Sequence, residues 1–257
     1  MVRFTTFGVN ITYIFQDKPK GISHAIKLCK EFVDNSNFVV YLGDNVLRKE
    51  LDDYAAKFES SNSDALILLC AVDEPQRFGV ADLDKQGKIK QIIEKPKNPS
   101  SNLAVIGIYF LTPKIFDIID NLKPSWRNEL EITDALQNLI DSGNKIEYDI
   151  VTGWWKDTGT PEDIIHANQL VLENFFLETN SQKINSKNDK VQLGEKTIVA
   201  DDSKIIGPVI IGNNCSLGPS VTIGPYVSIG NNSILENCTI KNSIVMNDCK
   251  ITSKIDI

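Results

Sequence analysis

The last third of the chain repeats every six residues, and this repeat constrains the fold more than any other feature of the sequence. Glycine follows four consecutive members of an apolar series, at positions 212, 218, 224 and 230. Since 15 of the 257 residues are Gly, four preset positions would all be Gly by chance with a probability of about 10⁻⁵. Such a repeat predicts a parallel β-helix, whose stacked coils direct one apolar side chain per hexad to the axis. The apolar series is Leu193, Val199, Ile205, Ile211, Leu217, Ile223, Ile229 and Leu235.

A second lane of the same repeat carries small or β-branched residues, and the glycines allow the backbone conformation that a coil corner requires. With three hexads per coil, the eight hexads of the apolar series make a little under three coils of a left-handed β-helix, which we expect at 193–257. The exposed coil faces and the open end of such a helix are natural docking surfaces, so we expect a homo-oligomer. The second lane comprises Ser203, Val209, Cys215, Val221, Val227, Ser233 and Thr239.

The first two thirds of the chain alternate short apolar runs with helical periodicity, which is typical of an α/β domain. We expect this domain at 1–177, joined to the β-helix by a polar linker at 178–192. The expected strands are 9–15, 38–42, 65–72, 104–111 and 145–151, with a hairpin over 80–93. The expected helices are 24–32, 47–60, 113–122, 132–142 and 161–176, the last of them capped by Thr160.

Composition and charge argue against several classes of function. The 27 Lys and Arg against 34 Asp and Glu give a net charge of −7 without a basic stripe, which disfavours nucleic acid as a partner. No apolar run approaches the roughly 18–20 residues of a membrane span, and 1–7 lack a signal-peptide pattern. We therefore expect a cytoplasmic protein without a membrane partner. The five cysteines form no Cys-x-x-Cys pair, which indicates reduced thiols rather than a disulfide framework or a zinc site.

Two acidic residues follow expected strands, at the sheet edge where ligands of open α/β sheets bind. Asp44 comes directly after the strand at 38–42, and Asp157 lies between a short apolar segment and the helix at 161–176. A carboxylate at this edge suits Mg²⁺, which takes oxygen ligands and shares them with substrate phosphates. The alternative is that Asp44 is a turn residue bonded to its own backbone and that Asp157 caps the helix.

Other polar residues lie in loops where they could contact a ligand. Lys95 follows the expected hairpin, where it could equally be solvated, and Gly79 leaves room for a ligand or for a kink in the hairpin. The amide of Gln16 can both donate and accept, as pairing with the edge of a base requires. Arg127 and Glu129 could clamp a ligand or form a surface ion pair of little energetic weight.

Seven segments occur together and in a particular order, and on them the chain resembles the sugar-phosphate nucleotidylyltransferases. The resemblance is greatest to the glucose-1-phosphate thymidylyltransferases of the longer kind, which carry a C-terminal hexapeptide β-helix, and it runs from about Phe7 to the end of the chain. The segments are Gln-x-x-Pro-x-Gly at 16–21, Leu-Gly-Asp-Asn at 42–45, Arg-Phe-Gly-Val at 77–80, Glu-Lys-Pro at 94–96, Asn-Leu-Ala-Val-x-Gly-x-Tyr at 102–109, Lys-Pro-Ser-x-Arg-x-Glu-Leu-Glu-Ile-Thr-Asp at 123–134 and Trp-x-Asp-Thr-Gly at 155–159.

The resemblance implies a Mg²⁺-dependent reaction in which a sugar 1-phosphate oxygen attacks the α-phosphorus of a nucleoside triphosphate and expels pyrophosphate. Catalysis of this kind rests mainly on positioning and on charge neutralisation. By resemblance, the catalytic residues are Asp44, Lys95, Arg127 and Asp157, of which Asp44 and Asp157 hold the Mg²⁺. The nucleotide site implied in the same way comprises Gln16, Pro19, Gly21 and Asp44. The sugar-phosphate site comprises Phe78, where relatives often have tyrosine, together with Gly79, Glu94, Lys95, Val105, Tyr109 and Arg127.

The sequence departs from the family at its beginning. The family opens with a buried strand and a glycine-rich, Arg-containing loop that cradles the triphosphate, and nothing similar precedes Gln16. We therefore expect 1–177 to form an incomplete Rossmann-like domain that exposes an unpaired sheet edge and apolar surface. We also expect the chain as given to be inactive or impaired, because oxyanion donors contribute orders of magnitude to rate.

Glucose 1-phosphate and dTTP are the expected substrates, and dTDP-glucose is the expected product. A base pocket that contains glutamine would also accept UTP, so a UTP-using glucose-1-phosphate uridylyltransferase is an alternative. Two further readings stay open. A noncatalytic regulatory or scaffold relative would explain the absent phosphate loop, although the retained Asp44, Asp157 and Lys95 argue against it. A hexapeptide acyltransferase is disfavoured because its usual histidine base has no counterpart in the β-helix: His24 and His166 both precede it.

Overall fold

The computed structural model describes residues 8–178, 190–252 and 255–256, and contacts divide the chain into two compact units, Met1–Trp155 and Lys156–Ile257. The expected division at 177 differs, because helix α6 (Pro161–Glu178) belongs to the second unit. Most of the expected linker at 178–192 lies outside the described residues. Of the helices described, none combines the length and apolar character needed to cross a bilayer.

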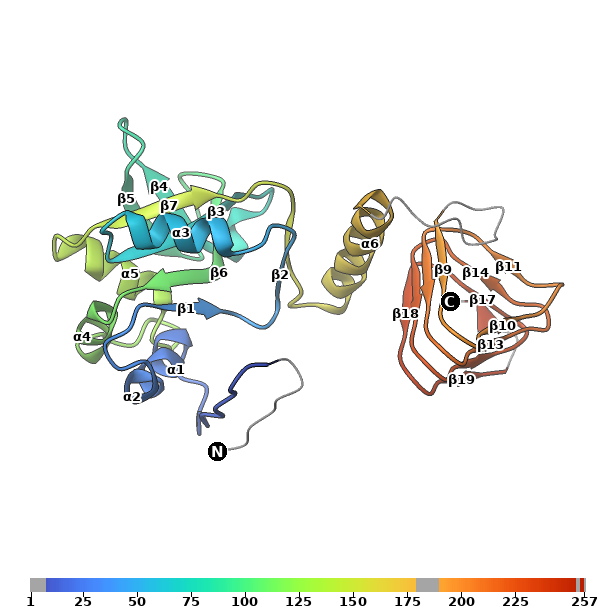
Figure 1. The fold of residues 1–257 in the computed structure, drawn as a ribbon. Helices are drawn as coiled ribbons and strands as arrows, with labels where there is room; N and C mark the ends of the chain where they lie inside the picture. Colours follow the sequence, from blue (N-terminus) through green and yellow to red (C-terminus); the bar gives the residue numbers. More distant parts are fainter. Residues whose placement is uncertain (1–7, 179–189, 253–254, 257) are drawn as a thin grey trace. The chain divides into compact units, whose positions relative to one another are not determined.

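The first unit is built on a mixed β-sheet (Figure 1). Its strand order is β5 (Ile89–Glu94), β4 (Gly79–Leu83), β6 (Leu103–Leu111), β3 (Ala65–Ala71) and β7 (Ile146–Ile150), and β1 (Phe38–Tyr41) also pairs with β6. The β3–β7 pair is parallel, whereas β6 runs antiparallel to β1, β3 and β4. The long β6 strand therefore joins β1, after which the chain reaches Asp44, to β4, which begins at Gly79.

Helices cover both faces of this sheet. Strand β3 is buried on both sides, so alternate residues enter two different cores. Ile67 and Leu69 pack into the core with α1 (Ile22–Leu28), α4 (Lys114–Asp120) and α5 (Ile132–Asp141). Leu66 and Leu68 pack into the second core beneath α3 (Asp52–Ser60). This arrangement confirms the expected α/β class, and it explains why the β3 sequence is continuously apolar.

Three of the expected elements in this unit are wrong in type or extent. The segment 9–15 is irregular and exposed rather than a strand, with Phe15 84% exposed. Of the helix expected at 47–60, only α3 forms, and Asn45–Leu47 is the short strand β2. The helix expected at 24–32 is interrupted at Cys29, after which α2 (Lys30–Val33) begins. An alternating apolar pattern makes a strand only where a neighbouring strand supplies hydrogen bonds, and 9–15 has none among the described residues.

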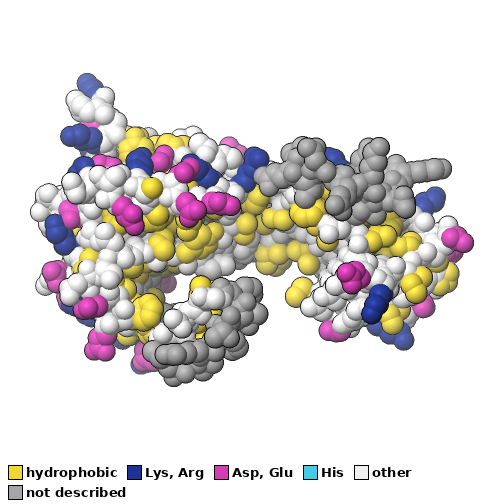
Figure 2. Space-filling view, in the orientation of Figure 1, with side chains coloured by type: hydrophobic (Ala, Val, Ile, Leu, Met, Phe, Trp, Pro, Cys, Tyr) yellow, Lys and Arg dark blue, Asp and Glu magenta, His cyan; other side chains and the backbone are white. Residues whose placement is uncertain are grey.

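The hairpin expected over 80–93 is confirmed by β4 and β5, which a short 3₁₀ helix, η1 (Pro75–Arg77), precedes. Its turn is fixed by Asp84, whose Oδ1 accepts hydrogen bonds from the backbone N–H groups of Gln86 and Lys88 at 2.8 Å each. Figure 2 shows basic side chains at the tip of this hairpin, and acidic and basic side chains interspersed over the rest of this face of the unit.

The second unit contains the expected left-handed parallel β-helix. Three parallel sheets form its faces, and the apolar series fills its core. The solenoid begins at Val191, two residues before the expected start. The first sheet stacks β10 (Ile198–Val199), β13 (Ser216–Leu217), β16 (Ile234–Leu235) and β19 (Lys250–Ile251); the second stacks β11 (Lys204–Ile205), β14 (Thr222–Ile223), β17 (Cys238–Ile240) and β20 (Ile255–Asp256); and the third stacks β9 (Val191–Leu193), β12 (Val209–Ile211), β15 (Val227–Ile229) and β18 (Ser243–Val245).

The repeat shortens toward the end of the β-helix, which corrects one member of the second lane. Val209 pairs with Val227, three hexads later, but Thr222 pairs with Thr239, one residue short of three hexads. The buried position of that turn is consequently taken by Cys238 instead of Thr239. Stacking between coils tolerates the change because the register is set by backbone pairing with the previous coil rather than by residue count.

Two kinds of residue make the corners of the coils. Gly224 has a φ of +98°, and a Cβ there would overlap the backbone carbonyl of Ile206 in the coil before it. Asparagine takes other left-handed positions, such as Asn214 and Asn232, in keeping with its tolerance of positive φ. Asparagine side chains also join successive coils, since the N–H of Asn213 donates a 2.7 Å hydrogen bond to Oδ1 of Asn231.

Helix α6 packs against the β-helix within the second unit. Its start follows the expected cap, with the N–H of Asp163 bonded to Thr160 Oγ1 at 3.2 Å. Further along, Asn168 Oδ1 accepts a 2.6 Å hydrogen bond from Ser228 Oγ, and Glu173 Oε1 accepts one of 2.8 Å from Tyr226 Oη. These polar contacts explain why α6 belongs with the solenoid rather than with the α/β unit.

Candidate functional site

Asp44 is held in place by its neighbour Asn45. The chain leaves β1 at Tyr41, turns through Gly43 and enters β2 at Asn45, which is buried. The amide Nδ2 of Asn45 donates a 2.8 Å hydrogen bond to Oδ1 of Asp44. Its Oδ1 accepts hydrogen bonds from the backbone N–H of Gly107 at 3.0 Å and from the indole of Trp155 at 2.7 Å. Asn45 thus fixes the carboxylate that follows β1, a role that the motif at 42–45 does not by itself indicate.

Tyr109 lies on β6, close enough to Asp44 for the charge of this carboxylate to act on its hydroxyl. Its side chain is buried on β6, and burial raises the pKa of its hydroxyl well above the ordinary value. The negative charges of Glu94, at the end of β5, and of Asp44, in the turn after β1, raise the pKa of Tyr109 further. Tyr109 therefore stays protonated as a hydrogen-bond donor at any physiological pH.

Three expected sugar-site residues meet where β4, β5 and β6 run side by side. Strand pairing sets Gly79 opposite both Glu94 and Val105. Thr133 Oγ1, on α5, donates a 3.0 Å hydrogen bond to Glu94 Oε2, and a Cβ on Gly79 would lie 2.5 Å from Thr133 Cγ2. Only glycine at position 79 leaves space for this contact, which explains its place in the motif.

Arg127 faces three carboxylates. Its guanidinium nitrogens lie 3.4 Å from Glu94, 3.2 Å from Glu129 and 3.6 Å from Glu131. The Arg127 side chain is 26% exposed and that of Glu131 only 6%. Ser125 adds rigidity, because its Oγ donates to Glu131 Oε1 at 2.8 Å and accepts from the N–H of Arg127 at 3.1 Å. The surface ion pair considered from the sequence is therefore part of a half-buried cluster.

Burial is the largest influence on the pKa of Glu94 and raises it above the ordinary value. The neighbouring charge of Glu131 raises the pKa of Glu94 as well, whereas the hydrogen bond from Thr133 and the charges of Lys95 and Arg127 lower it. The net direction is upward, so the Glu94 carboxyl holds its proton to a higher pH than an exposed glutamate does.

Lys95 and Phe78 lie at the open end of the hairpin. The N–H of Lys95 donates a 3.0 Å hydrogen bond to the carbonyl of Phe78, and Lys95 has a φ of 42°. A left-handed conformation is uncommon for a lysine and turns the chain directly after β5. The ring of Phe78 packs edge-on against Trp155 at 5.5 Å between centroids. Lys95 itself is exposed, directly after the half-buried Glu94.

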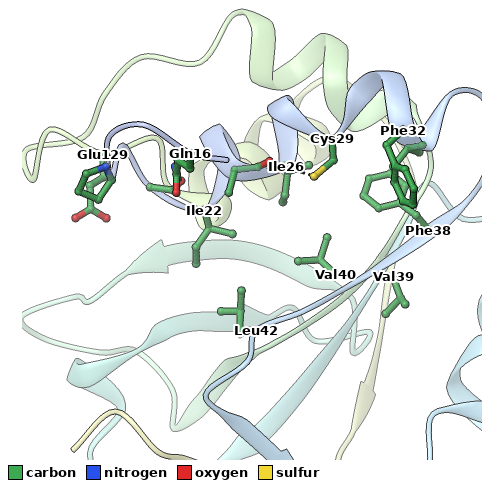
Figure 3. Close-up of a pocket in the computed structure, with 14 residues that line it drawn as sticks. Gln16, Ile22, Ile26, Cys29, Phe32, Phe38, Val39, Val40, Leu42 and Glu129 are labelled. Carbon is green, nitrogen blue, oxygen red and sulfur yellow. Dashed lines mark hydrogen bonds between the residues drawn. The ribbon is translucent and has the colours of Figure 1, made fainter. Parts of the chain in front are cut away.

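Gln16, Pro19 and Gly21 line one wall of a cavity of about 500 Å³ between α1 and β1 (Figure 3). Gly21 has a φ of +95°, and a Cβ there would lie 2.5 Å from the carbonyl oxygen of Leu130. Leu130 N–H donates to the carbonyl of Lys20 at 2.8 Å and its own carbonyl accepts from Ser23 N–H at 3.1 Å. The loop at 16–21 is therefore fastened to the segment that carries Arg127.

The rest of that cavity is mostly apolar. Figure 3 shows Glu129 and Gln16 at one end and Phe32 and Phe38 at the other, with β1 residues along the floor. Among the described residues β1 pairs with β6 alone, so its other edge is open, and Val39 and Tyr41 are 46% and 42% exposed. The expected exposed sheet edge is thus present at β1.

Asp157 and Asp44 belong to different compact units. Asp157 ends β8 (Trp155–Asp157) and follows Lys156, which forms a 2.6 Å ion pair with Asp163 in the first turn of α6. Across 8–178, 190–252 and 255–256, no group of three or more His, Cys, Asp or Glu side chains is arranged to hold a metal ion. A Mg²⁺ ion bound between protein and substrate phosphates needs only one or two carboxylates.

Several residues that shape the site lack a role in the sequence analysis: Asn45, Ser125, Glu131 and Thr133, together with His24, whose Nδ1 lies 2.9 Å from Gln16 Nε2. Ser125, Glu131 and Thr133 lie within the motif at 123–134, and Asn45 lies within the motif at 42–45, so the sequence motifs do mark these four positions. His24 carries no such signal, because its contact depends on where the helix α1 begins relative to the loop.

Comparison with known proteins gives concordant matches over most of the chain. Residues 2–174 match the family described as nucleotidyl transferase, and 190–225 match the bacterial transferase hexapeptide family. The low-salt glycan biosynthesis nucleotidyltransferase Agl11 of Haloferax volcanii is 45% identical over 96% of this chain and 70% of its own length. A glucose-1-phosphate thymidylyltransferase of Streptomyces antibioticus is 39% identical over 92% of this chain and 65% of its own.

Two further relatives differ in the nucleotide that their names specify. The UTP–glucose-1-phosphate uridylyltransferase AglF of Haloferax volcanii is 39% identical over 65% of this chain and 69% of its own length. A solved structure described as a candidate glucose-1-phosphate thymidylyltransferase of Bacillus anthracis, with sucrose bound, is 43% identical with a TM-score of 0.60, over 69% of each chain. The chain thus spans about two thirds of the length of these proteins.

Proposed function

Because the chain belongs to the nucleotidyl transferase family and carries C-terminal hexapeptide repeats, we propose that it transfers a nucleotidyl group to a sugar 1-phosphate. Glucose 1-phosphate and dTTP are the proposed substrates, and dTDP-glucose and pyrophosphate the products. The names of two thymidylyltransferase relatives support this choice.

The observation that carries the proposal is the double role of the segment 125–133. Through Leu130 it bonds to Lys20 and Ser23, which flank Gly21 at the end of the loop that holds Gln16. Through Arg127 and Thr133 it bonds to Glu94. One continuous segment therefore sets the distance between the proposed base site and the proposed sugar-phosphate site. Fixing two substrates relative to one another is, with charge neutralisation, a main source of catalysis in phosphoryl and nucleotidyl transfer.

Each proposed sugar-phosphate residue has a chemistry that suits its role. Glu94 can accept hydrogen bonds from sugar hydroxyls, and Tyr109 can donate one because its hydroxyl stays protonated. Lys95 and Arg127 would neutralise the attacking phosphate, whose oxygen bonds to the α-phosphorus as pyrophosphate leaves. Gly79 and Val105 would leave room beside Glu94, and Phe78 would cover the ring of the sugar.

Asp44 would hold the Mg²⁺ that such a transfer requires, and Asp157 is proposed as a second ligand from the sequence motif. The donor chemistry fits, since both are carboxylates and Mg²⁺ takes oxygen ligands. When bound, the ion neutralises charge on the triphosphate. The hydrogen bond from Asn45 would keep Asp44 oriented before the substrates arrive.

Gln16, with Pro19 and Gly21, is the proposed base site, and UTP is the second candidate nucleotide. The AglF relative favours UTP, because its name specifies that nucleotide. The two bases differ by one methyl group, whose burial in an apolar pocket is worth about 1–3 kcal/mol. The cavity beside Gln16 has apolar walls from Ile22 and Leu42 that suit the methyl group of thymine.

A steady-state assay of the full chain tests this proposal. Pyrophosphate release is measured with glucose 1-phosphate, Mg²⁺ and either dTTP or UTP. We expect slow turnover, in keeping with an impaired chain, which Asp44→Asn reduces at least about a hundredfold further, whereas Asp53→Asn, on the exposed side of α3, leaves it unchanged. Nucleotide binding without turnover would instead support a noncatalytic relative, and undiminished turnover in Asp44→Asn would overturn the metal assignment. Self-association through the β-helix and a cytoplasmic location stay predictions.

A further inference from the structure

The orientation of the Gln16 side chain is determined by two neighbours. Gln16 Nε2 lies 3.4 Å from the backbone carbonyl oxygen of Gly21 and 2.9 Å from Nδ1 of His24. A carbonyl oxygen only accepts hydrogen bonds, so the amide group that faces Gly21 must be the NH₂ end. This requirement settles which end of the amide is nitrogen, a choice that side-chain shape alone leaves ambiguous.

The same geometry specifies the tautomer of His24. One amide proton of Gln16 is directed to Gly21 and the other to His24, so Nδ1 of His24 must be the acceptor. A neutral imidazole that accepts at Nδ1 carries its proton on Nε2. With both protons of its NH₂ group used, Gln16 offers a ligand its carbonyl oxygen, Oε1, which is an acceptor only.

An acceptor at this position distinguishes between pyrimidine bases. Uracil and thymine carry a proton on N3 and donate from it, whereas cytosine has a bare N3 that accepts. Oε1 of Gln16 can therefore pair with N3–H of uracil or thymine and faces the lone pair of cytosine unfavourably. A buried polar group left without its partner is a strong source of discrimination between ligands of the same shape.

We propose that His24 is a specificity-determining positioning residue: by accepting from Gln16 Nε2, it holds the amide with Oε1 toward the base and so selects uracil or thymine over cytosine. This inference rests on the proposed function, because it takes Gln16 as the base-reading residue. Figure 3 shows Gln16 at the Glu129 end of the cavity, above Ile22, where such a base would lie.

The tautomer of His24 is the first test and needs no nucleotide. Long-range ¹H–¹⁵N correlation spectra of the full chain at neutral pH report the protonated nitrogen of each imidazole, and His166→Gln assigns the two histidines. We expect His24 to carry its proton on Nε2 and Gln16→Leu to shift the Nδ1 resonance. A proton on Nδ1 in the wild type would overturn the inference, whether or not the chain binds nucleotides.

Paired variants at position 24 test the consequence for specificity. His24→Asp offers only acceptors to Gln16 and should keep the ratio of UTP to CTP affinity within about twofold of the wild type. His24→Lys offers only donors, should reverse the amide, and should lower that ratio about tenfold or more. A general effect of the added charge changes the affinities for UTP and CTP alike, so it does not alter their ratio. Leu28→Lys, elsewhere on α1, is the control variant for such an effect.

The outcomes separate the inference from the function on which it rests. If wild type binds UTP more tightly than CTP and His24→Lys leaves the ratio unchanged, the role of His24 is overturned while the base site stands. If the wild type binds neither nucleotide, the proposed base site fails, and the specificity role of His24 fails with it.

Discussion

The indole N–H of Trp155 donates a 2.7 Å hydrogen bond to Oδ1 of Asn45, across 110 residues of sequence. The same oxygen accepts from the backbone of Gly107, and the amide nitrogen of Asn45 holds Asp44. One buried side chain therefore connects the proposed metal ligand to the central strand β6 and to the end of the first unit.

Replacing Asn45 by leucine should lower both stability and activity. The substitution leaves the buried N–H of Gly107 and the half-buried indole N–H of Trp155 without acceptors, at up to about 1–3 kcal/mol each. We expect the free energy of unfolding to fall by about 2–5 kcal/mol, measured by urea denaturation, and Mg²⁺-dependent turnover to fall further. Asn121→Ala, which removes an exposed hydrogen bond to the carbonyl of Asp117, is the control and should change stability by less than about 1 kcal/mol. Equal effects of the two substitutions would contradict the role assigned to Asn45.

Gly21→Ala should disturb the base loop. Its φ of +95° and the 2.5 Å distance from a Cβ to the Leu130 carbonyl mean that the backbone must move to accept a side chain. We expect a loss of about 2–4 kcal/mol in the free energy of unfolding and weaker nucleotide binding, by calorimetry. Gly43→Ala is the matched control, because nothing lies within 4 Å of a Cβ there. A thermal midpoint unchanged by Gly21→Ala would show that the loop is not held by Leu130.

Arg127→Met should act on the sugar phosphate rather than on the nucleotide. Its loss removes one of the two proposed phosphate-binding cations, so we expect KM for glucose 1-phosphate to rise about tenfold or more, with KM for dTTP within about twofold. Initial-rate kinetics with each substrate varied in turn make the comparison. Lys114→Met, whose ion-pair partner is Asp64, should leave both constants unchanged. An increase in KM for dTTP alone would indicate that Arg127 acts at the nucleotide site instead of the sugar-phosphate site.

Glu94→Gln should change how stability depends on pH. Burial raises the pKa of Glu94 in the folded state, so between its unfolded and folded pKa values the unfolded chain binds fewer protons, and stability falls as pH rises. Glutamine cannot ionise and removes this effect. The difference in urea midpoint, Glu94→Gln minus wild type, should therefore increase from pH 4 to pH 7.5. A difference that decreases over this range would mean that Arg127, Lys95 and Thr133 outweigh burial.

Much of the fold follows from local patterns. The six-residue period predicts the β-helix because each hexad pairs with its counterpart one coil away, so a single local rule generates the whole solenoid. The β4–β5 hairpin and the Thr160 cap are likewise signalled by residues adjacent in sequence. Where the local rule changes, at the shortened turn before Cys238, the prediction fails by one residue.

The candidate site divides in the same way. The motifs predict Gln16, Asp44, Glu94 and Arg127 one by one, because each lies in a recognisable segment. The sequence by itself therefore determines which chemical groups are available to the site. Tertiary structure alone decides that Arg127 contacts Glu94, that Asn45 bonds to both Asp44 and Trp155, and that His24 lies within hydrogen-bond distance of the Gln16 amide. The physical reason is that periodicity reports which residues share a face of an element, whereas side-chain partners depend on which distant strand or helix packs opposite that face.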